Sequence, residues 1–352
     1  MDTKGKVLTV LGPVEPCSLG RTLTHEHLSL DFRVAYTSPP ALTEHKTECD
    51  FTLPNLGWIR QNPYSHHKNI QFNGEEVDKL VEEELHEFYK SGGGTIVENT
   101  SIGIKRNIAL VKRLAKSTNV KLVAGTGYYV SGSQSSSTLN STVEELCNTI
   151  VKDMTQGCDD DPTVRCGLLG EVGCSWPLED FERRSVNAAG LMQQQLGCPV
   201  MFHPGRNEDA PDEILRLYAE AGGAMSKAVM GHLDRTFHTM EELEEFAALG
   251  SYLEYDLFGI ETSHYQLNTA IDMPSDGQRI ARIKHLVDAG YEDKILLSHD
   301  IHTRNRLSAF GGHGFSYILQ CIVPKMLTRG LTQQDVDDFL LHNPQHWLTF
   351  TK

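Results

Sequence analysis

The sequence predicts an α/β protein made of a single (β/α)8 TIM barrel, with its active site at the mouth formed by the carboxyl ends of the strands. Three observations lead to this fold class. Short apolar runs recur eight times along the 352 residues, amphipathic and charge-rich stretches separate most of them, and no Pro- or Ser-rich linker divides the chain. Strand and helix alternating in this way are typical of a closed parallel barrel. We therefore expect residues 1–352 to form one domain.

The expected strands are short β-branched or apolar runs bounded by residues that commonly end a strand. In chain order they are Arg21–His25, Thr95–Asn99, Lys121–Thr126, Gly167–Glu171, Pro199–His203, Ala228–His232, Ser251–Tyr255 and Ile295–His299. The expected helices place apolar residues at helical spacing among charged ones. They are Glu75–Ser91, Ile108–Ser117, Val143–Thr155, Val186–Gln195, Pro211–Glu220, Met240–Ala248 and Asp276–Ala289.

Two stretches depart from this repeat. Residues 32–73 are rich in Pro, Asn and His and follow the first strand, and residues 131–142 form a Ser/Thr/Asn run after the third. Barrel enzymes build their active sites from the loops that follow the strands. Both stretches are therefore expected to be loops on the substrate side.

The composition limits the kinds of partner and the compartment. A net charge of -15 argues against nucleic acid, because binding a phosphate backbone requires a cationic face. The amino terminus lacks the apolar segment of a signal peptide, and no apolar run is long enough to span a membrane. The eight cysteines include no CxxC pair and are expected to be reduced thiols. These features favour a cytoplasmic protein that acts on a small molecule, and a homodimer is compatible with them.

The first strand ends in the sequence His25-Glu26-His27. Residues i and i+2 of an extended chain point the same way, so both imidazoles could reach one metal ion. This motif alone is a weak signal, because two histidines can end a strand without binding a metal. Four later strands also end in a side chain that can bind a metal. These residues are Glu171, His203, His232 and Asp300.

In a barrel, these six residues meet at the mouth and form a set of four imidazoles and two carboxylates. Such a set suits two divalent ions, Zn²⁺ in the first place, with Mn²⁺ as an alternative. His299 is expected to face away from Asp300, and His302 lies in the loop that follows. Neither His299 nor His302 is expected to be a direct ligand.

At this point the sequence resembles the phosphotriesterase-like branch of the amidohydrolase superfamily, and within it the phosphotriesterase-related proteins. The resemblance covers nearly the whole chain. The segments that carry it are LGRTLTHEHL, LVAGTGYY, GEVGCSWPL, FHPGR, GHLDR, LLSHDIH and HNPQHWL. It implies that His25, His27 and Asp300 bind the more buried metal, and that His203 and His232 bind the more exposed one.

Many relatives bridge the two metals with a carbamylated lysine, whereas this chain has Glu171 at that position. A glutamate offers two anionic oxygens and can span two ions roughly 3.5–4 Å apart. The alternative is that Glu171 is a barrel carboxylate paired with a histidine. A water between the ions would supply hydroxide as the nucleophile, and the resemblance implies that Asp300 acts as general base and then as general acid. Tyr129 is expected either to steady the reacting oxygen or only to pack.

Three arginines follow ligand-bearing strands closely. They are Arg206, Arg235 and Arg304. Cations at the mouth of an acidic protein suggest recognition of a carboxylate or sulfonate. The alternative is that these arginines pair with nearby acids. The acids in question are Glu208, Asp209 and Asp234.

An anionic substrate favours amide hydrolysis over hydrolysis of a neutral phosphotriester. We therefore expect a hydrolase of small N-acyl amides with an anionic tail, and the resemblance points to N-acetyltaurine, and hence to taurine metabolism, or to N-acyl amino acids. A lactonase or carboxylesterase with promiscuous phosphotriesterase activity is the alternative enzyme. A catalytically silent barrel that binds a metabolite or a protein is the alternative of another class.

Overall fold

The computed structural model describes residues 3–352 and contains a barrel of eight parallel strands. Neighbouring strands follow the order of the chain from β3 to β12, and the ends of the series are joined where His25 and Asp300 meet, with Asp300 N donating to His25 O at 3.1 Å. The barrel strands are β3 (Arg21–Glu26), β6 (Gly93–Glu98), β7 (Lys121–Thr126), β8 (Leu168–Gly173), β9 (Val200–His203), β10 (Ala228–Met230), β11 (Tyr252–Tyr255) and β12 (Ile295–Leu297). The predicted fold class and its eight strands are confirmed.

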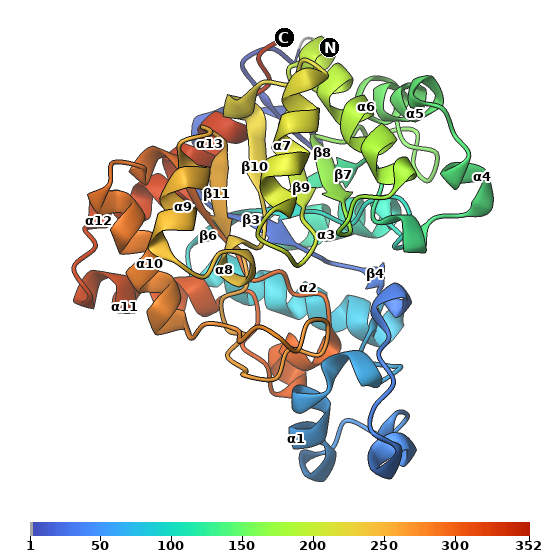
Figure 1. The fold of residues 1–352 in the computed structure, drawn as a ribbon, viewed down its shortest axis with the longest axis vertical. Coiled ribbons are helices and arrows are strands. Elements are labelled where there is room, and N and C mark those ends of the chain that lie inside the picture. The colour runs from blue at the N-terminus through green and yellow to red at the C-terminus, as the bar shows by residue number, and fades with distance from the viewer. Residues whose placement is uncertain (1–2) are drawn as a thin grey trace.

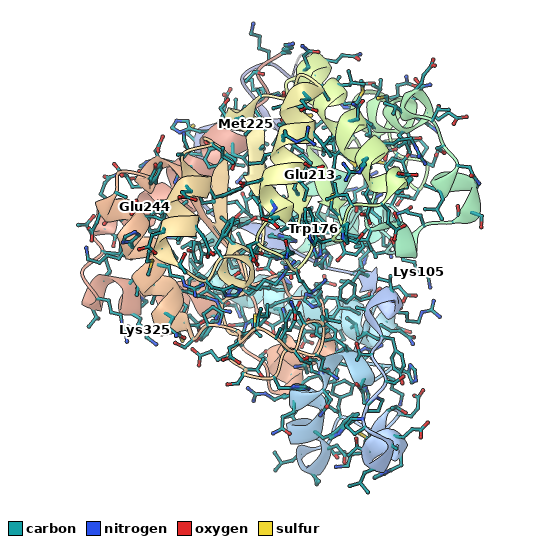
Figure 2. The ribbon with its side chains drawn as sticks, in the orientation of Figure 1. Lys105, Trp176, Glu213, Met225, Glu244 and Lys325 are labelled. Carbon is teal, nitrogen blue, oxygen red and sulfur yellow. The ribbon has the colours of Figure 1, made fainter. Side chains whose placement is uncertain are left out.

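Helices surround the barrel (Figure 1). Seven of them match the predicted helices to within a few residues: α2 (Glu75–Lys90), α3 (Ile108–Thr118), α5 (Val143–Thr155), α6 (Asp180–Leu196), α7 (Ala210–Glu220), α9 (Met240–Ala247) and α10 (Asp276–Asp288). Helix α6 begins earlier than predicted because Glu179 and Glu182 form a capping box at its amino end. Charged side chains such as Lys105, Glu244 and Lys325 are exposed on the outside of the molecule (Figure 2).

The remaining elements are short. Two antiparallel pairs join β1 (Val7–Thr9) to β2 (Gly12–Val14) and β4 (Leu30–Asp31) to β5 (Gln71–Phe72). The short helices outside the prediction are α1 (Leu53–Gln61), α4 (Ser136–Leu139), α8 (Leu233–Thr236), α11 (Val323–Thr328), α12 (Gln333–Asp337) and α13 (Asn343–Leu348). No helix within residues 3–352 is long and apolar enough to cross a membrane.

The interior of the barrel is filled by buried side chains away from the mouth. One residue from each of seven strands contributes to this layer: Val97, Val123, Leu168, Met201, Val229, Tyr252 and Leu296. Trp347 of α13 joins the layer and is fully buried, and its indole Nε1 donates to the carbonyl of Lys227 at 3.2 Å. The filled layer leaves the opposite, carboxyl end of the strands as the place for a site.

The segment 32–73 carries α1 and extends away from the barrel at the end opposite the two termini (Figure 1). Segment 131–142 instead folds back on its own neighbours. Gln134 Nε2 donates to the carbonyls of Ile102 and Tyr129, and Thr142 caps α5. A third segment, 256–275, joins β11 to α10 and contains no helix or strand. This third segment was not among the loops predicted on the substrate side.

Candidate metal centre

His25 and His27 are each held in place by a hydrogen bond at the ring nitrogen Nδ1. His25 Nδ1 donates to Asp256 Oδ2 at 2.9 Å. His27 Nδ1 contacts Thr100 Oγ1 at 2.9 Å, and since the Thr100 hydroxyl donates to Glu98, His27 must be the donor in its own bond. In the neutral form of each ring, Nε2 therefore keeps its lone pair and is free to bind a metal.

The Nε2 atoms of these two histidines face Glu171 and Asp300. His27 Nε2 lies 3.3 Å from Glu171 Oε1 and 3.2 Å from Asp300 Oδ1, and His25 Nε2 lies 3.5 Å from Glu171 Oε2. All four side chains are at least nine-tenths buried. His25 Nε2 is fully buried without any hydrogen-bond partner. An unsatisfied buried nitrogen is costly, and a metal ion beside it would remove that cost.

His203 and His232 form a second group around the same Glu171. His203 Nδ1 lies 2.9 Å from Glu171 Oε2 and 2.7 Å from His232 Nε2. His232 Nδ1 donates to Asp256 Oδ1 at 2.8 Å, which turns its Nε2 toward this group. Glu171 thus contacts both pairs of histidines through its two oxygens.

The donor set fits two divalent ions. The ligand atoms of His25, His27 and Asp300 lie within 4.8 Å of one another, and so do those of Glu171, His203 and His232. Imidazole nitrogens and carboxylate oxygens are the ligands that zinc prefers in catalytic sites. The six residues predicted as ligands are therefore brought together in two groups, each able to hold an ion.

Two of these side chains are placed by unusual backbone. His232 has a φ of 59° and Asp300 a φ of 52°, in the left-handed region that side-chain-bearing residues seldom adopt. Such a conformation costs about 1–3 kcal/mol and is maintained only where the surroundings fix it. The backbone N–H of His232 donates to both oxygens of Asp256 at 3.0 Å, which supplies part of that support.

Burial and neighbouring charges together set the protonation of the ligands. Burial raises the pKa of Glu171 and of Asp300, but the surrounding histidines outweigh it and hold both pKa values well below the usual range. Burial and the neighbouring His232 lower the pKa of His203 to about 3, so its ring stays neutral. Burial opposes the charge on His27 as well, yet its bonds to Asp300 and Glu171 raise its pKa to about 9. A metal at His27 would replace that proton.

Sequence reasoning missed Asp256, which lies directly after β11. Its two oxygens accept from the rings of His25 and His232, one from each group. Burial works against its charge, but His232 and His25 keep its pKa below the usual range. A signal was present, because the seventh strand also ends beside a carboxylate in the pair Tyr255-Asp256.

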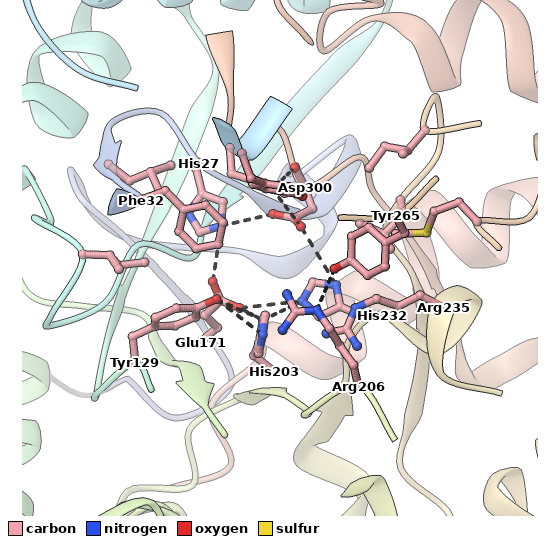
Figure 3. A pocket seen from close by; sticks show the side chains of 17 residues that line it. His27, Phe32, Tyr129, Glu171, His203, Arg206, His232, Arg235, Tyr265 and Asp300 are labelled. Atoms are coloured by element: carbon pink, nitrogen blue, oxygen red, sulfur yellow. Dashed lines mark hydrogen bonds and ion pairs between the residues drawn. The ribbon is translucent and has the colours of Figure 1, made fainter. Parts of the chain in front are cut away.

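A small cavity lies directly beside these ligands (Figure 3). It is lined by His27, Leu30, Phe32, Tyr64, Ile104, Tyr129, Glu171, His203, Arg206, His232, Arg235, Leu257, Ile260, Tyr265, Met273, Asp300 and His302. Segment 32–73 contributes Phe32 and Tyr64, whereas segment 131–142 contributes none of the lining. Residues 131–142 lie outside this lining and are bound to their own neighbours, so their place on the substrate side stays a prediction.

Three of the four predicted substrate contacts line the cavity. Tyr129 is buried, and its hydroxyl oxygen lies 3.4 Å from His203 Nε2. Within residues 3–352, neither Arg206 nor Arg235 forms an ion pair with an acidic side chain, and Asp234 is bound instead by Arg279 at 2.7 Å. The predicted alternative, pairing with nearby acids, is thus contradicted for these two arginines.

Arg304 does not line the cavity, and its role as a substrate contact stays a prediction. Its Nε donates to the carbonyl of Gln71 at 2.9 Å and its Nη2 to that of Asn73 at 3.2 Å. These bonds fix the end of segment 32–73 against the barrel. His302 lines the cavity instead, with its Nδ1 3.1 Å from Asp300 Oδ2.

Comparisons with known proteins agree with this arrangement. Residues 5–348 match the phosphotriesterase family. The chain is 53% identical to the N-acetyltaurine hydrolase of Salmo salar and 50% identical to that of Homo sapiens, each over 98% of this chain and 98% of the relative.

Solved structures also match this chain over nearly its whole length. A resiniferatoxin-binding protein from Rhodobacter sphaeroides matches with a TM-score of 0.93 at 28% identity, over 98% of this chain and 96% of that chain. The phosphotriesterase homology protein of Escherichia coli, solved with phosphate in its active site, matches with a TM-score of 0.75 at 25% identity, over 94% and 99%. The resemblance seen in the sequence is confirmed, and the chain belongs to the phosphotriesterase family.

Proposed function

We propose that this protein hydrolyses small N-acyl amides with an anionic tail, and N-acetyltaurine in particular, at a centre of two divalent ions, most simply Zn²⁺. The observation that carries the proposal is the pair of arginines, Arg206 and Arg235, which lie without acidic partners in the same cavity as the six candidate ligands. Arg235 is 2% exposed, and its Nη1 has no hydrogen-bond partner among the described residues 3–352. A buried guanidinium in this state favours an anionic ligand.

Each ligand group has a defined part in this proposal. His25, His27 and Asp300 would hold one ion, His203 and His232 the other, and Glu171 would bridge them. When bound, two such ions supply a nucleophile at neutral pH and polarise the scissile carbonyl. Asp300 carries its charge on a buried carboxylate between His27 and His302, so it is placed to accept a proton and return it to the leaving nitrogen.

The two sides of the cavity suggest how the substrate lies. Phe32 and Tyr129 lie on one side of the candidate ligands, and Arg206 and Arg235 lie on the other (Figure 3). Leu30 and Ile104 are buried apolar residues that also line the cavity. A short acyl group would therefore face Phe32 while the acid faces the arginines, with the amide bond over the ligands between them.

The relatives support the same chemistry. Two relatives that match over 98% of their own length are N-acetyltaurine hydrolases, whose substrate is an acetyl amide with a sulfonate. The Escherichia coli relative holds a phosphate, another anion, in its active site. Both observations favour an anionic group close to the metal ligands.

The proposal predicts metal-dependent amide hydrolysis. Protein loaded with Zn²⁺ or Mn²⁺ is expected to hydrolyse N-acetyltaurine, and a chelator should abolish this activity until the metal is restored. The assay measures release of the free amine, with N-acyl amino acids, a neutral lactone and a phosphotriester as comparison substrates. Turnover that persists after metal removal has been verified by elemental analysis would contradict the proposed centre, and preference for the lactone would contradict the proposed substrate.

Replacing Glu171 with Gln should weaken binding of both metals together. The substitution keeps the size of the side chain but removes the charge from a carboxylate whose two oxygens contact both pairs of histidines. Elemental analysis after dialysis against a graded metal buffer measures the number of ions retained. Loss of one ion alone, or of none, would show that Glu171 is not shared between the two positions.

A further inference from the structure

The cavity beside the candidate ligands is too small for any amide substrate. Its volume is about 20 Å³. A space of this size holds about one water molecule. An N-acyl amide has several times the volume of a water molecule, so part of the wall must move before a substrate can reach the ligands.

A second, much larger cavity lies on the other side of that wall. Its volume is about 640 Å³. Three residues line both cavities: Tyr64, Ile260 and Tyr265. The rings of Tyr64 and Tyr265 meet edge to face, with their centroids 6.4 Å apart. The two tyrosines therefore form the partition between the open cavity and the ligands.

The two tyrosines are held very differently. Tyr64 is stacked on His302 and its hydroxyl donates to His302 Nε2 at 3.0 Å, so it is attached to the loop that follows the last barrel strand. Tyr265 belongs to segment 256–275, which has no helix or strand. Loops longer than about 12–15 residues without such elements are often functional lids. Tyr265 is therefore the side of the partition that can move.

One hydrogen bond links the Tyr265 side chain to the site. Arg206 Nε donates to the Tyr265 hydroxyl at 2.7 Å, and the guanidinium carbon lies 5.6 Å from the centre of the same ring. Arg206 and Arg235 both line the small cavity, and neither has an acidic partner within residues 3–352. The phenol oxygen thus occupies a donor that a carboxylate or sulfonate would bind more strongly, since a charged acceptor makes the stronger bond.

We propose that Tyr265 gates the site: its ring closes the small cavity, and its hydroxyl occupies the place on Arg206 that the acid of the substrate takes when the gate opens. An anionic substrate replaces the bond that opening breaks, whereas a neutral molecule does not. Tyr265 is in this sense a specificity-determining residue. The inference rests on the proposed function only for the identity of the anion.

Binding of a small inert anion tests the gate without any turnover. Isothermal titration of methanesulfonate into the metal-loaded protein should show about tenfold tighter binding to Tyr265→Phe than to the unmodified chain, because opening no longer breaks a hydrogen bond to a charged group. Tyr265→Leu should also bind methanesulfonate more tightly than the unmodified chain. The gain would then not depend on keeping an aromatic ring at this position. Tyr89→Phe is the control, since it removes an exposed phenol hydroxyl of α2 outside both cavities, and its affinity should be unchanged.

The outcomes separate the gate from the proposed function. Affinity that is unchanged or weaker in both Tyr265 variants, with thermal unfolding as in the unmodified chain, would overturn the gate even if the protein hydrolyses N-acetyltaurine. Tighter binding in a protein that hydrolyses no amide would support the gate and reject the function. The gain should also disappear when Arg206→Ala is combined with Tyr265→Phe, and a gain that remains would show that the hydroxyl does not act through Arg206.

Discussion

Replacing Asp300 with Asn is expected to lower kcat by about two to four orders of magnitude, the usual contribution of a positioned acid or base. The substitution removes the charge that faces His27 and His302 and the oxygen that would accept a proton. It should leave the fold intact, because Asn is among the residues that best tolerate the left-handed backbone found at Asp300, with its φ of 52°. The measurement is kcat together with metal content and circular dichroism.

Asp288→Asn is a suitable control for this substitution. Asp288 ends α10 and pairs with Lys284 on the surface, an arrangement worth at most about 1 kcal/mol. Its kcat should match that of the unmodified chain. Near-normal turnover in Asp300→Asn, with the metals retained, would exclude Asp300 as the proton carrier.

The strands could be predicted because each is a short apolar run with a clear end. Two predicted strands run two residues too far, and the site explains both errors. Strand β10 ends at Met230 and β12 at Leu297, because the chain leaves the sheet before His232 and Asp300 to enter the left-handed conformations that aim these side chains. A sequence pattern shows where apolar residues stop, but not where functional backbone departs from the sheet.

The candidate ligands could be predicted because they lie at the ends of strands, which a barrel brings together. Asp256 also lies at a strand end, and it was missed because its role depends on contacts with His25 and His232, both far from it in sequence. Tyr265 was missed for the same reason, because its proposed role depends on one hydrogen bond to Arg206, which is far from it in sequence. Loop residues of this kind are placed by tertiary contacts that no local pattern encodes.

Substitution of Arg206 or Arg235 with Ala is expected to raise KM for an anionic amide by about thirty- to several-hundred-fold. Truncating one partner of a desolvated, charge-assisted pair costs on the order of 2–4 kcal/mol. The acid does not react, so its bond is present in the ground state and the transition state alike, and kcat should change much less than KM. Arg216→Ala is the control, because Arg216 pairs with Glu213 and Glu220 on the surface of α7 and its loss should leave KM unchanged.

A substrate whose acid is masked as a neutral ester distinguishes recognition of charge from a change in the shape of the site. Arg206→Ala and Arg235→Ala should handle the masked compound about as well as the unmodified chain does, because the cations then have no charge to bind. The two arginines differ in one respect: Arg235 carries a buried, unpartnered Nη1, whereas Arg206 Nε is bound to Tyr265. Arg235→Ala should therefore give the larger rise in KM for the charged substrate. If both variants treat the charged and masked compounds alike, the anionic substrate is excluded and hydrolysis of a neutral lactone or ester becomes the better account of this site.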